Sequence, residues 1–340
     1  MDKNAPFAMK NAMLVPLTFT WGHFVDILIQ ERGGMTELAR YLQDIAPTSA
    51  KLSDDTTTVE RGLRRLRQRG NAEGNKYGRL LLRCFGIPIP IVEWARELGM
   101  YHRRSSDLSV QLRRDQLRLW DCPPINETPS AAWIHIGLAS VAHREKDRAQ
   151  LQRRMELAQL FFSEQEPGSQ LEYRLLEARI QTDQGRFPES LETLELASSL
   201  LKTAELPSHD AACFRARILD QKAYTLSRGW KSVPDKLDAA LALYQSIDLE
   251  EGAPFVAFRR FHGIAWCLWR QGKESEALLA AQKACSYAGD GGFIRLRIMS
   301  LGQQANILGS DSQEGRELLE RARGMAKQLQ DRQLFEKLDV

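Results

Sequence analysis

Basic side chains gather in one short stretch of this 340-residue sequence, and their chemistry is that of binding a polyanion. Between residues 56 and 83 the chain carries eight Arg or Lys residues and two Glu residues, a local net charge of +6. The whole chain has a net charge of only +3, so positive charge is concentrated in this stretch. Guanidinium and ammonium groups held together can bind phosphates and read base edges. The stretch therefore predicts a nucleic-acid contact.

The pattern around these residues predicts which of them point outward. Val59, Leu63 and Leu66 recur at helical spacing and predict a buried face. Asp54 or Asp55 would cap the start of this helix. The opposite face and the basic groups that follow it supply the predicted DNA-binding residues, which are Thr57, Arg61, Arg64, Arg65, Gln68, Lys76 and Arg79.

Two roles are expected within this set if it binds duplex DNA. Arg61 and Arg64 would contact base edges in the major groove, whereas Lys76 and Arg79 would hold phosphates. An arginine-rich helix face can also be an ordinary solvated surface, or can form ion pairs with acidic groups elsewhere in the chain. An inert or protein-binding helical cap and an RNA-binding segment therefore remain as alternatives.

A second set of cationic and aromatic residues lies on the polar faces of helices predicted after residue 170. Trp266 and Trp269 are prominent because large apolar side chains on a non-core face often mark contact sites. Arginine beside tryptophan or tyrosine suits a peptide that carries a carboxylate. The alternative is that both tryptophans are buried against a neighbouring repeat. The predicted partner-binding residues are Arg179, Arg217, Tyr224, Arg228, Arg259, His262, Trp266, Trp269 and Arg270.

Motifs for catalysis, metal binding and cofactor binding are absent from the sequence. It contains no P-loop, no GxGxxG after a predicted strand, no GxSxG and no HExxH. The five cysteines are widely spaced and form no CxxC, which predicts reduced thiols in or near the core. We therefore expect a protein that is not an enzyme and has no catalytic residues, no metal site and no cofactor.

The elements that must position these residues are indicated by a two-helix pattern that repeats after residue 130. In its clearest copy, Ala265 lies on the buried face of a first helix, Gly272 ends that helix, and Ala277 lies on the buried face of the second. Small residues at such positions let two helices approach closely. The copies cover residues 131–162, 171–201, 216–247, 258–288 and 294–325. Glycine marks the same turn in three other copies, at Gly185, Gly229 and Gly309.

This pattern resembles the tetratricopeptide repeat, which combines a large residue, Leu-Gly or Leu-Ala, a turn glycine and two small residues in the second helix. The resemblance covers about residues 131–325, with a spacing of roughly 40 residues in place of the usual 34. It implies an α-solenoid of about five helical hairpins over residues 130–340. It also implies a concave face that binds a peptide or protein partner, or an array that mediates homodimerisation.

Residues 1–121 are predicted to form a separate basic helical domain. A first helix ends at Gly33, a short second helix follows, and the third helix, which ends at Gly70, displays its polar face outward. That is the layout of a helix-turn-helix domain. Leu108, Leu112 and Leu119 lie roughly in line on a further helix, which either belongs to this domain or begins the array.

A helix-turn-helix-like domain followed by such an array resembles the bacterial peptide-responsive regulators. The resemblance implies an all-α, DNA-binding transcriptional regulator, although the glutamine-rich short turn common in that group is absent here. The alternative is an adaptor or scaffold whose N-terminal domain caps the array or binds another protein. No apolar run approaches the ~18–20 residues that span a bilayer. We therefore expect a cytoplasmic protein with no membrane partner.

Overall fold

The computed structural model describes residues 19–45, 54–69, 73–162, 166–228, 235–249, 253–309 and 311–338. These residues form α-helices and short 3-10 helices and contain no strand, so the all-helical prediction is confirmed. The chain divides into two compact units, one of Met1–Trp94 with Cys122–Glu127 and one of Ala95–Asp121 with Thr128–Val340. Among the described helices, none combines the length and apolar character that crossing a membrane requires.

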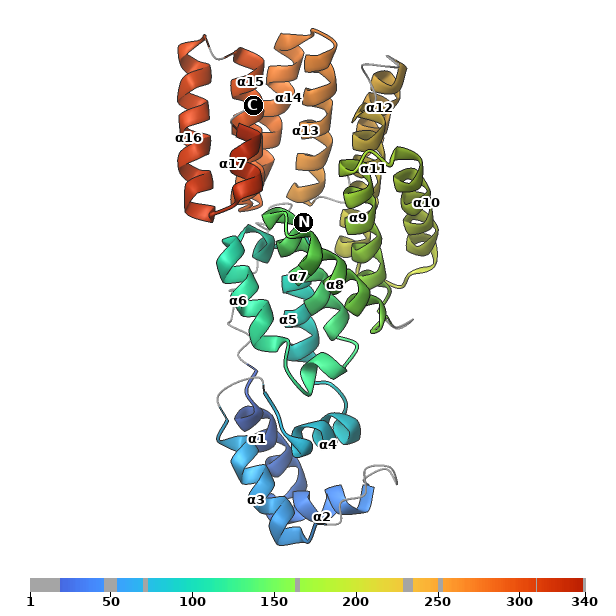
Figure 1. The fold of residues 1–340 in the computed structure, drawn as a ribbon, viewed down its shortest axis with the longest axis vertical. Coiled ribbons are helices and arrows are strands. Elements are labelled where there is room, and N and C mark those ends of the chain that lie inside the picture. Colours follow the sequence, from blue (N-terminus) through green and yellow to red (C-terminus); the bar gives the residue numbers. More distant parts are fainter. Residues whose placement is uncertain are drawn as a thin grey trace, which may run out of the picture. The chain divides into compact units, whose positions relative to one another are not determined.

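Three helices of the first unit, α1 (Trp21–Arg32), α3 (Thr56–Arg67) and α4 (Lys76–Phe85), begin after a residue whose side chain caps the helix. The Asp55 carboxylate accepts a hydrogen bond from the Thr58 amide at 2.7 Å, so the predicted start of the arginine-rich helix is confirmed. Gly70, its predicted end, lies outside the described residues, and the helix itself ends at Arg67. The unit also contains α2 (Met35–Ile45) and the first part of α5 (Ile89–Gly99) (Figure 1).

One apolar cluster holds α1 to α4 together, and it contains the residues that the helical pattern predicted. A close approach fixes α4 on α3, because a Cβ added at Gly62 would lie 1.8 Å from the Tyr77 ring. The Tyr77 hydroxyl then donates to the Asp54 carboxylate at 2.9 Å, which anchors the ring beyond the start of α3. The predicted residues Val59, Leu63 and Leu66 are buried in this cluster, together with Trp21, Val25, Leu28, Leu38, Ala39 and Leu42.

Helix α6 (Val110–Trp120) buries a different face from the one that its leucines suggested. Leu112 and Leu119 are 45% and 57% exposed, whereas Arg113 is fully buried. The Arg113 guanidinium donates to the Leu98 carbonyl at 2.7 and 3.1 Å, at the end of α5. A helix end leaves carbonyls without partners, and a cation satisfies them well. The same buried face carries Val110, Leu117 and Trp120, and α6 packs against α7 in the second unit.

Each of the five repeated segments forms a pair of helices (Figure 1). Gly185, Gly272 and Gly309 adopt φ values of 78°, 76° and 82°, so these turns need the left-handed backbone that glycine adopts without strain. Gly229 lies outside the described residues. The pairs are α7 (Ala131–Glu145) with α8 (Arg148–Gln159), α9 (Pro167–Asp183) with α10 (Phe187–Thr203), α11 (Ser208–Arg228) with α12 (Asp235–Gln245), α13 (Pro254–Arg270) with α14 (Glu274–Asp290), and α15 (Ile294–Leu308) with α16 (Gln313–Leu329).

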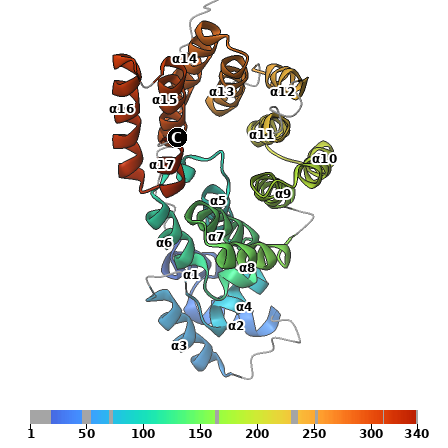
Figure 2. The same cartoon turned by 45° about the horizontal axis from the view of Figure 1, so that its top comes forward.

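These five pairs, here called the array, follow one another along an arc. The first helices of the pairs (α7, α9, α11, α13 and α15) contact one another in sequence and lie on the inner side of the arc in Figure 2. A last helix, α17 (Arg332–Leu338), packs on both α16 and α7. The end of the array therefore returns to its beginning, and its inner face surrounds a common centre.

The first testable prediction concerns the tight helix packing inside the array. Replacing Ala265 with leucine is expected to lower the free energy of unfolding by about 1–3 kcal/mol, because Ala265 and Ala277 are both fully buried in one cluster. Urea denaturation checks this, with Ala239→Leu at an exposed position of α12 as the matched control. Equal midpoints for the two variants would show that Ala265 is not at a close helix contact.

Candidate functional site

The exposed side of α3 carries the predicted DNA-binding residues. Thr57, Arg61, Arg64, Arg65 and Gln68, here called the α3 face, are all exposed, while Val59, Leu63 and Leu66 are buried on the other side. The outward orientation predicted from the helical pattern is therefore confirmed. Lys76 and Arg79, at the start of α4, are exposed as well.

The basic groups of the first unit differ in how far they are already paired. Arg64 lies 3.0 Å from Glu60, and Lys76 pairs with Asp54. Arg79 donates to both Glu127 oxygens at 2.7 Å. Among the described residues, Arg61 and Arg65 have neither an ion pair nor a side-chain hydrogen bond. The two unpaired guanidinium groups are therefore the ones most available to an anionic partner.

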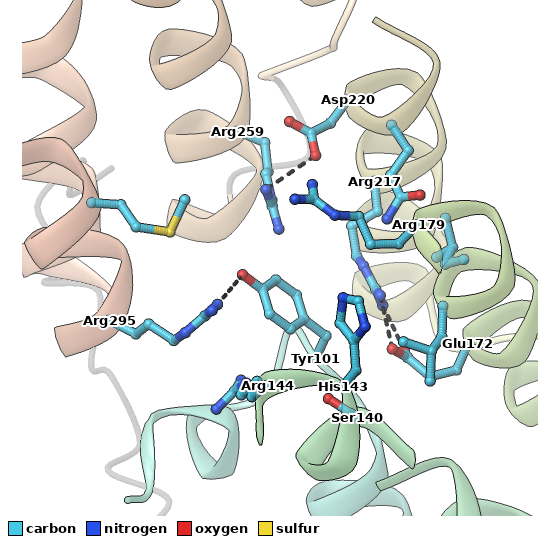
Figure 3. Close-up of a pocket in the computed structure, with 14 residues that line it drawn as sticks. Tyr101, Ser140, His143, Arg144, Glu172, Arg179, Arg217, Asp220, Arg259 and Arg295 are labelled. Atoms are coloured by element: carbon cyan, nitrogen blue, oxygen red, sulfur yellow. Dashed lines mark hydrogen bonds and ion pairs between the residues drawn. The ribbon is translucent and has the colours of Figure 1, made fainter. Parts of the chain in front are cut away.

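A pocket of about 120 Å³ lies at the centre of the array (Figure 3). Each first helix contributes an arginine to it, and Tyr101, from the segment after α5, contributes the aromatic ring near its middle. Glu172 of α9 and Asp220 of α11 are the carboxylates of the lining. We call this site the arginine pocket, and its arginines are Arg144, Arg179, Arg217, Arg259 and Arg295.

Several lining residues occupy equivalent positions in successive helix pairs. Glu172 and Arg217 each lie six residues before a small buried alanine, Ala178 and Ala223. Arg259 lies six residues before Ala265 in the same way. Because the alanine fixes the packed face of each first helix, the position six residues earlier faces inward each time. The repeat therefore places a charged group at the same inner position of three consecutive helices.

Ion pairs hold four of the five arginines in place. Arg217 binds both oxygens of Glu172, at 2.5 and 2.8 Å, and the two side chains are 6% and 5% exposed. Three further guanidinium groups each have a carboxylate partner: Arg259 with Asp220 at 3.0 Å, Arg179 with Asp183 at 3.1 Å, and Arg295 with Asp331 at 2.8 Å. Arginine binds carboxylate in a rigid planar geometry, so these pairs fix the directions of the guanidinium groups.

Arg144 is the arginine without a carboxylate of its own. It is 4% exposed, and its Nη1 donates to the Ser106 carbonyl at 3.1 Å. Its distance to Asp331, the partner of Arg295, is 3.8 Å. Burial and the neighbouring cations Arg295 and Arg113 lower the pKa of Arg144, yet a guanidinium remains protonated at neutral pH. Its Nη2 is buried and has no hydrogen-bond partner among the described residues.

A buried neutral histidine contacts Arg217, one of the arginines of the pocket. His102 is 2% exposed, and its Nε2 lies 3.0 Å from an Asp210 oxygen while its Nδ1 lies 3.3 Å from Arg217 Nη1. Arginine can only donate, so Nδ1 accepts and Nε2 carries the proton that is donated to Asp210. Burial lowers the pKa of His102 to about 4, although the hydrogen bond to Asp210 opposes the shift. The ring therefore stays neutral at pH 7.

The predicted partner-binding residues are divided between the pocket and other places. Arg179, Arg217 and Arg259 line the pocket. The Tyr224 hydroxyl accepts from Arg179 at 3.2 Å, with the guanidinium carbon 4.1 Å from the ring centroid. Arg228 lies 5.8 Å from the same ring centroid. These five predicted residues therefore lie in or beside the arginine pocket.

The remaining predicted residues do not line the pocket. Trp266 and Trp269 are half-buried and pack against two apolar clusters of the array. Arg270 lies over the Trp269 ring, 4.2 Å from its centroid, and His262 stacks on Phe258 at 5.1 Å. The packing of both tryptophans agrees with the alternative stated for them, burial between helices.

Sequence reasoning missed the groups that complete the pocket. Tyr101 lies outside the repeats, and its ring is within 5.0–5.7 Å of the guanidinium carbons of Arg217, Arg259 and Arg295. Arg144 and Arg295 lie in the first and last pairs, and Asp331 lies beside both because α17 returns to α7. The sequence contained one signal for this pocket, which is the equivalent inward position of Glu172, Arg217 and Arg259 in three consecutive pairs.

The chemistry offered by the two candidate sites is recognition of anions. The α3 face presents free guanidinium groups on a helix surface, and the arginine pocket presents several fixed guanidinium groups in a confined space. Both arrangements suit phosphate or carboxylate oxygens. Comparison with known protein families found no family whose model matches this chain, and comparison with curated proteins found no matching relative.

Proposed function

We propose that the protein is a DNA-binding transcriptional regulator. In this proposal the α3 face contacts duplex DNA, and the array binds a peptide or another acidic partner on its inner face or mediates dimerisation. One observation carries the DNA-binding part: α3 and its C-cap residue Gln68 present five polar or basic side chains on one exposed face, opposite a packed core. Two of its arginines, Arg61 and Arg65, are unpaired among the described residues.

An exposed helix of this kind fits the dimensions and chemistry of a major groove. Guanidinium groups match the O6 and N7 acceptors of guanine, and Gln68 can bond to adenine. Lys76 and Arg79 would exchange their carboxylate partners for phosphates. Exposed ion pairs contribute only about 0–1 kcal/mol, so this exchange costs little.

A second function is supported by the ion pairs of the first unit. Arg64, Lys76 and Arg79 are each matched by a carboxylate of the same unit, which suits a surface already balanced in charge. The protein would then be an adaptor whose N-terminal unit caps the array or binds another protein. DNA affinity distinguishes this adaptor function from the regulator.

The second prediction tests the α3 face on the full-length protein. Arg61→Ala and Arg65→Ala are each expected to weaken binding by about 1–3 kcal/mol where the arginine contacts a base edge. The measurement is fluorescence anisotropy with a duplex that the wild-type protein has enriched from a random pool. Loss of Arg79, a phosphate contact in this proposal, should weaken all duplexes alike and reduce the salt slope by about one unit.

The matched control is Arg321→Ala, which removes an exposed arginine of α16 and should leave DNA affinity unchanged. If the folded wild-type protein binds no duplex even at low salt, the regulator proposal is wrong and the adaptor function is favoured. If Arg61, Arg65 and Arg321 variants all bind equally well, DNA binding does not use the α3 face.

A further inference from the structure

The arginine pocket collects more positive charge than its lining compensates. Five arginines line it, against the two carboxylates Glu172 and Asp220. Asp183 and Asp331 pair with Arg179 and Arg295 from outside the lining, which leaves Arg144 without a carboxylate of its own. Asp107 is a further carboxylate near Arg295 and Arg144, and its Oδ1 accepts from the Arg295 amide at 3.1 Å. The guanidinium groups still outnumber the carboxylates of the lining, so an anion that enters the pocket is attracted electrostatically.

Two donor atoms of the lining arginines remain without acceptors, within the protein behind the pocket surface. Arg144 Nη2 and Arg259 Nε are buried and have no hydrogen-bond partner among the described residues. In Figure 3 the Arg179 and Arg259 side chains point toward one another above the Tyr101 ring. These converging guanidinium groups line the same small space as those of Arg217 and Arg295.

The guanidinium groups are held in fixed positions before any ligand arrives. Asp220 holds Arg259 at 3.0 Å, and the Tyr101 hydroxyl accepts from Arg295 at 2.8 Å. A site whose donors are already oriented loses little conformational entropy when a ligand binds. Such a cluster is built for binding and is unlike a set of mobile surface arginines.

The size of the pocket limits what can enter it. A water molecule occupies about 30 Å³ of the liquid, so a volume of 120 Å³ has room for about four waters. A phosphate group, or the carboxylate groups of a small acid, fit this space, whereas several residues of extended peptide do not. We propose that the arginine pocket binds one compact oxyanion, a free small molecule that carries a phosphate or several carboxylates. This proposal rests on the ligand-binding role proposed for the array, and it does not depend on DNA binding.

Titration calorimetry on the full-length protein tests this, at low ionic strength in a buffer free of multivalent anions. The probes are inorganic phosphate, citrate and a capped tetraglutamate peptide, and the expected result is saturable binding of phosphate or citrate with one site per chain. If phosphate binds more tightly than citrate, the recognised group is a phosphate. If citrate binds more tightly, it is a carboxylate. Binding of the peptide alone would overturn the proposal of a free small ligand, as would no saturable binding of any probe.

Variants locate the site. Arg179→Gln is expected to weaken the affinity for the preferred anion about tenfold or more, because it removes a charge-assisted donor. Arg174→Gln, on the same helix, is the matched control and should bind as the wild type does, since Arg174 pairs with Glu177 outside the pocket. Equal affinity of the Arg179 variant and the wild type would overturn the proposed site.

A stability measurement separates a ligand-binding Arg144 from a purely structural one. Arg144→Gln is expected to leave the melting temperature in anion-free buffer unchanged or higher, and to abolish the rise in melting temperature that phosphate or citrate produces in the wild type. A large drop in melting temperature with the anion response retained would show that Arg144 is structural. If this variant does not fold, the Arg179 comparison decides, because that side chain is 24% exposed and its loss is better tolerated. DNA binding by α3 is measured separately, so failure of one proposal leaves the other intact.

Discussion

Replacing Arg217 with methionine is expected to lower the free energy of unfolding by about 3–5 kcal/mol. Arg217 and Glu172 are 6% and 5% exposed and share two hydrogen bonds, so removing the cation leaves the Glu172 carboxylate buried without its partner. His102 Nδ1 also loses its donor. Chemical denaturation monitored by circular dichroism at 222 nm measures the change.

A double variant shows whether the pair itself is stabilising. Glu172→Leu combined with Arg217→Met replaces both charges with apolar groups, and should recover most of the lost stability because no buried charge remains. Arg215→Met, an exposed arginine two residues away on α11, is the matched control and should change stability by less than about 0.5 kcal/mol. A double variant as unstable as Arg217→Met would show that the pair is not the source of the effect.

Acidification between about pH 6.5 and pH 4 is expected to reduce the free energy of unfolding, and His102 should account for up to about 3 kcal/mol of the loss. The folded-state pKa of His102 is about 4, below its ordinary value of 6.5, because the ring is buried. Between these two pKa values the unfolded chain binds a proton that the folded chain does not. Stability therefore falls as the pH falls through this window, and is fully present above pH 6.5.

The groups that face His102 explain why protonation is resisted. Phe214 and Phe255 lie 5.0 and 5.9 Å away, measured between ring centroids, and the guanidinium of Arg217 donates to Nδ1. Asp210 accepts from Nε2 and favours the charged ring, but Arg103 already bonds to both of its oxygens at 3.0 Å. A second proton on Nδ1 would also point at Arg217. Burial and this cation therefore outweigh Asp210.

His102→Gln isolates this histidine, because the glutamine amide can still donate to Asp210 but does not titrate. Stability is measured by denaturation at intervals from pH 7.5 to pH 4, and the profile of the wild type should be steeper than that of the variant. Burial also lowers the pKa of His135 to about 4, but His135 is present in both proteins and its effect cancels in the difference. Parallel profiles would show that His102 takes up its proton in the folded state as readily as in the unfolded chain.

The helices and their turns were predicted from the sequence because both depend on local physics. The spacing of Val59, Leu63 and Leu66 identifies the buried face of α3, and the exposure of Arg61 follows from the helical repeat alone. Gly185 and Gly272 mark turns because few other residues adopt a positive φ without strain. These features need no knowledge of the rest of the molecule.

Helix α6 shows where local patterns stop being sufficient. Leu112 and Leu119 indicated a buried face, but the open carbonyls at the end of α5 draw Arg113 into the interior. The sequence cannot show that demand, because it arises between helices that pack together only in the folded chain. The face of α6 that packs inward is the one that combines Arg113 with Val110, Leu117 and Trp120.

The sequence by itself determined that the first helices of the array carry arginines on their polar faces, as at Arg179, Arg217 and Arg259. Periodicity separates a polar face from a packed one, but it does not say whether the polar face looks toward bulk water or toward other helices. Only the tertiary structure decided this, because α17 returns to α7 and brings Asp331 between Arg144 and Arg295. The return of the chain brings five separate polar faces together around one positively charged pocket.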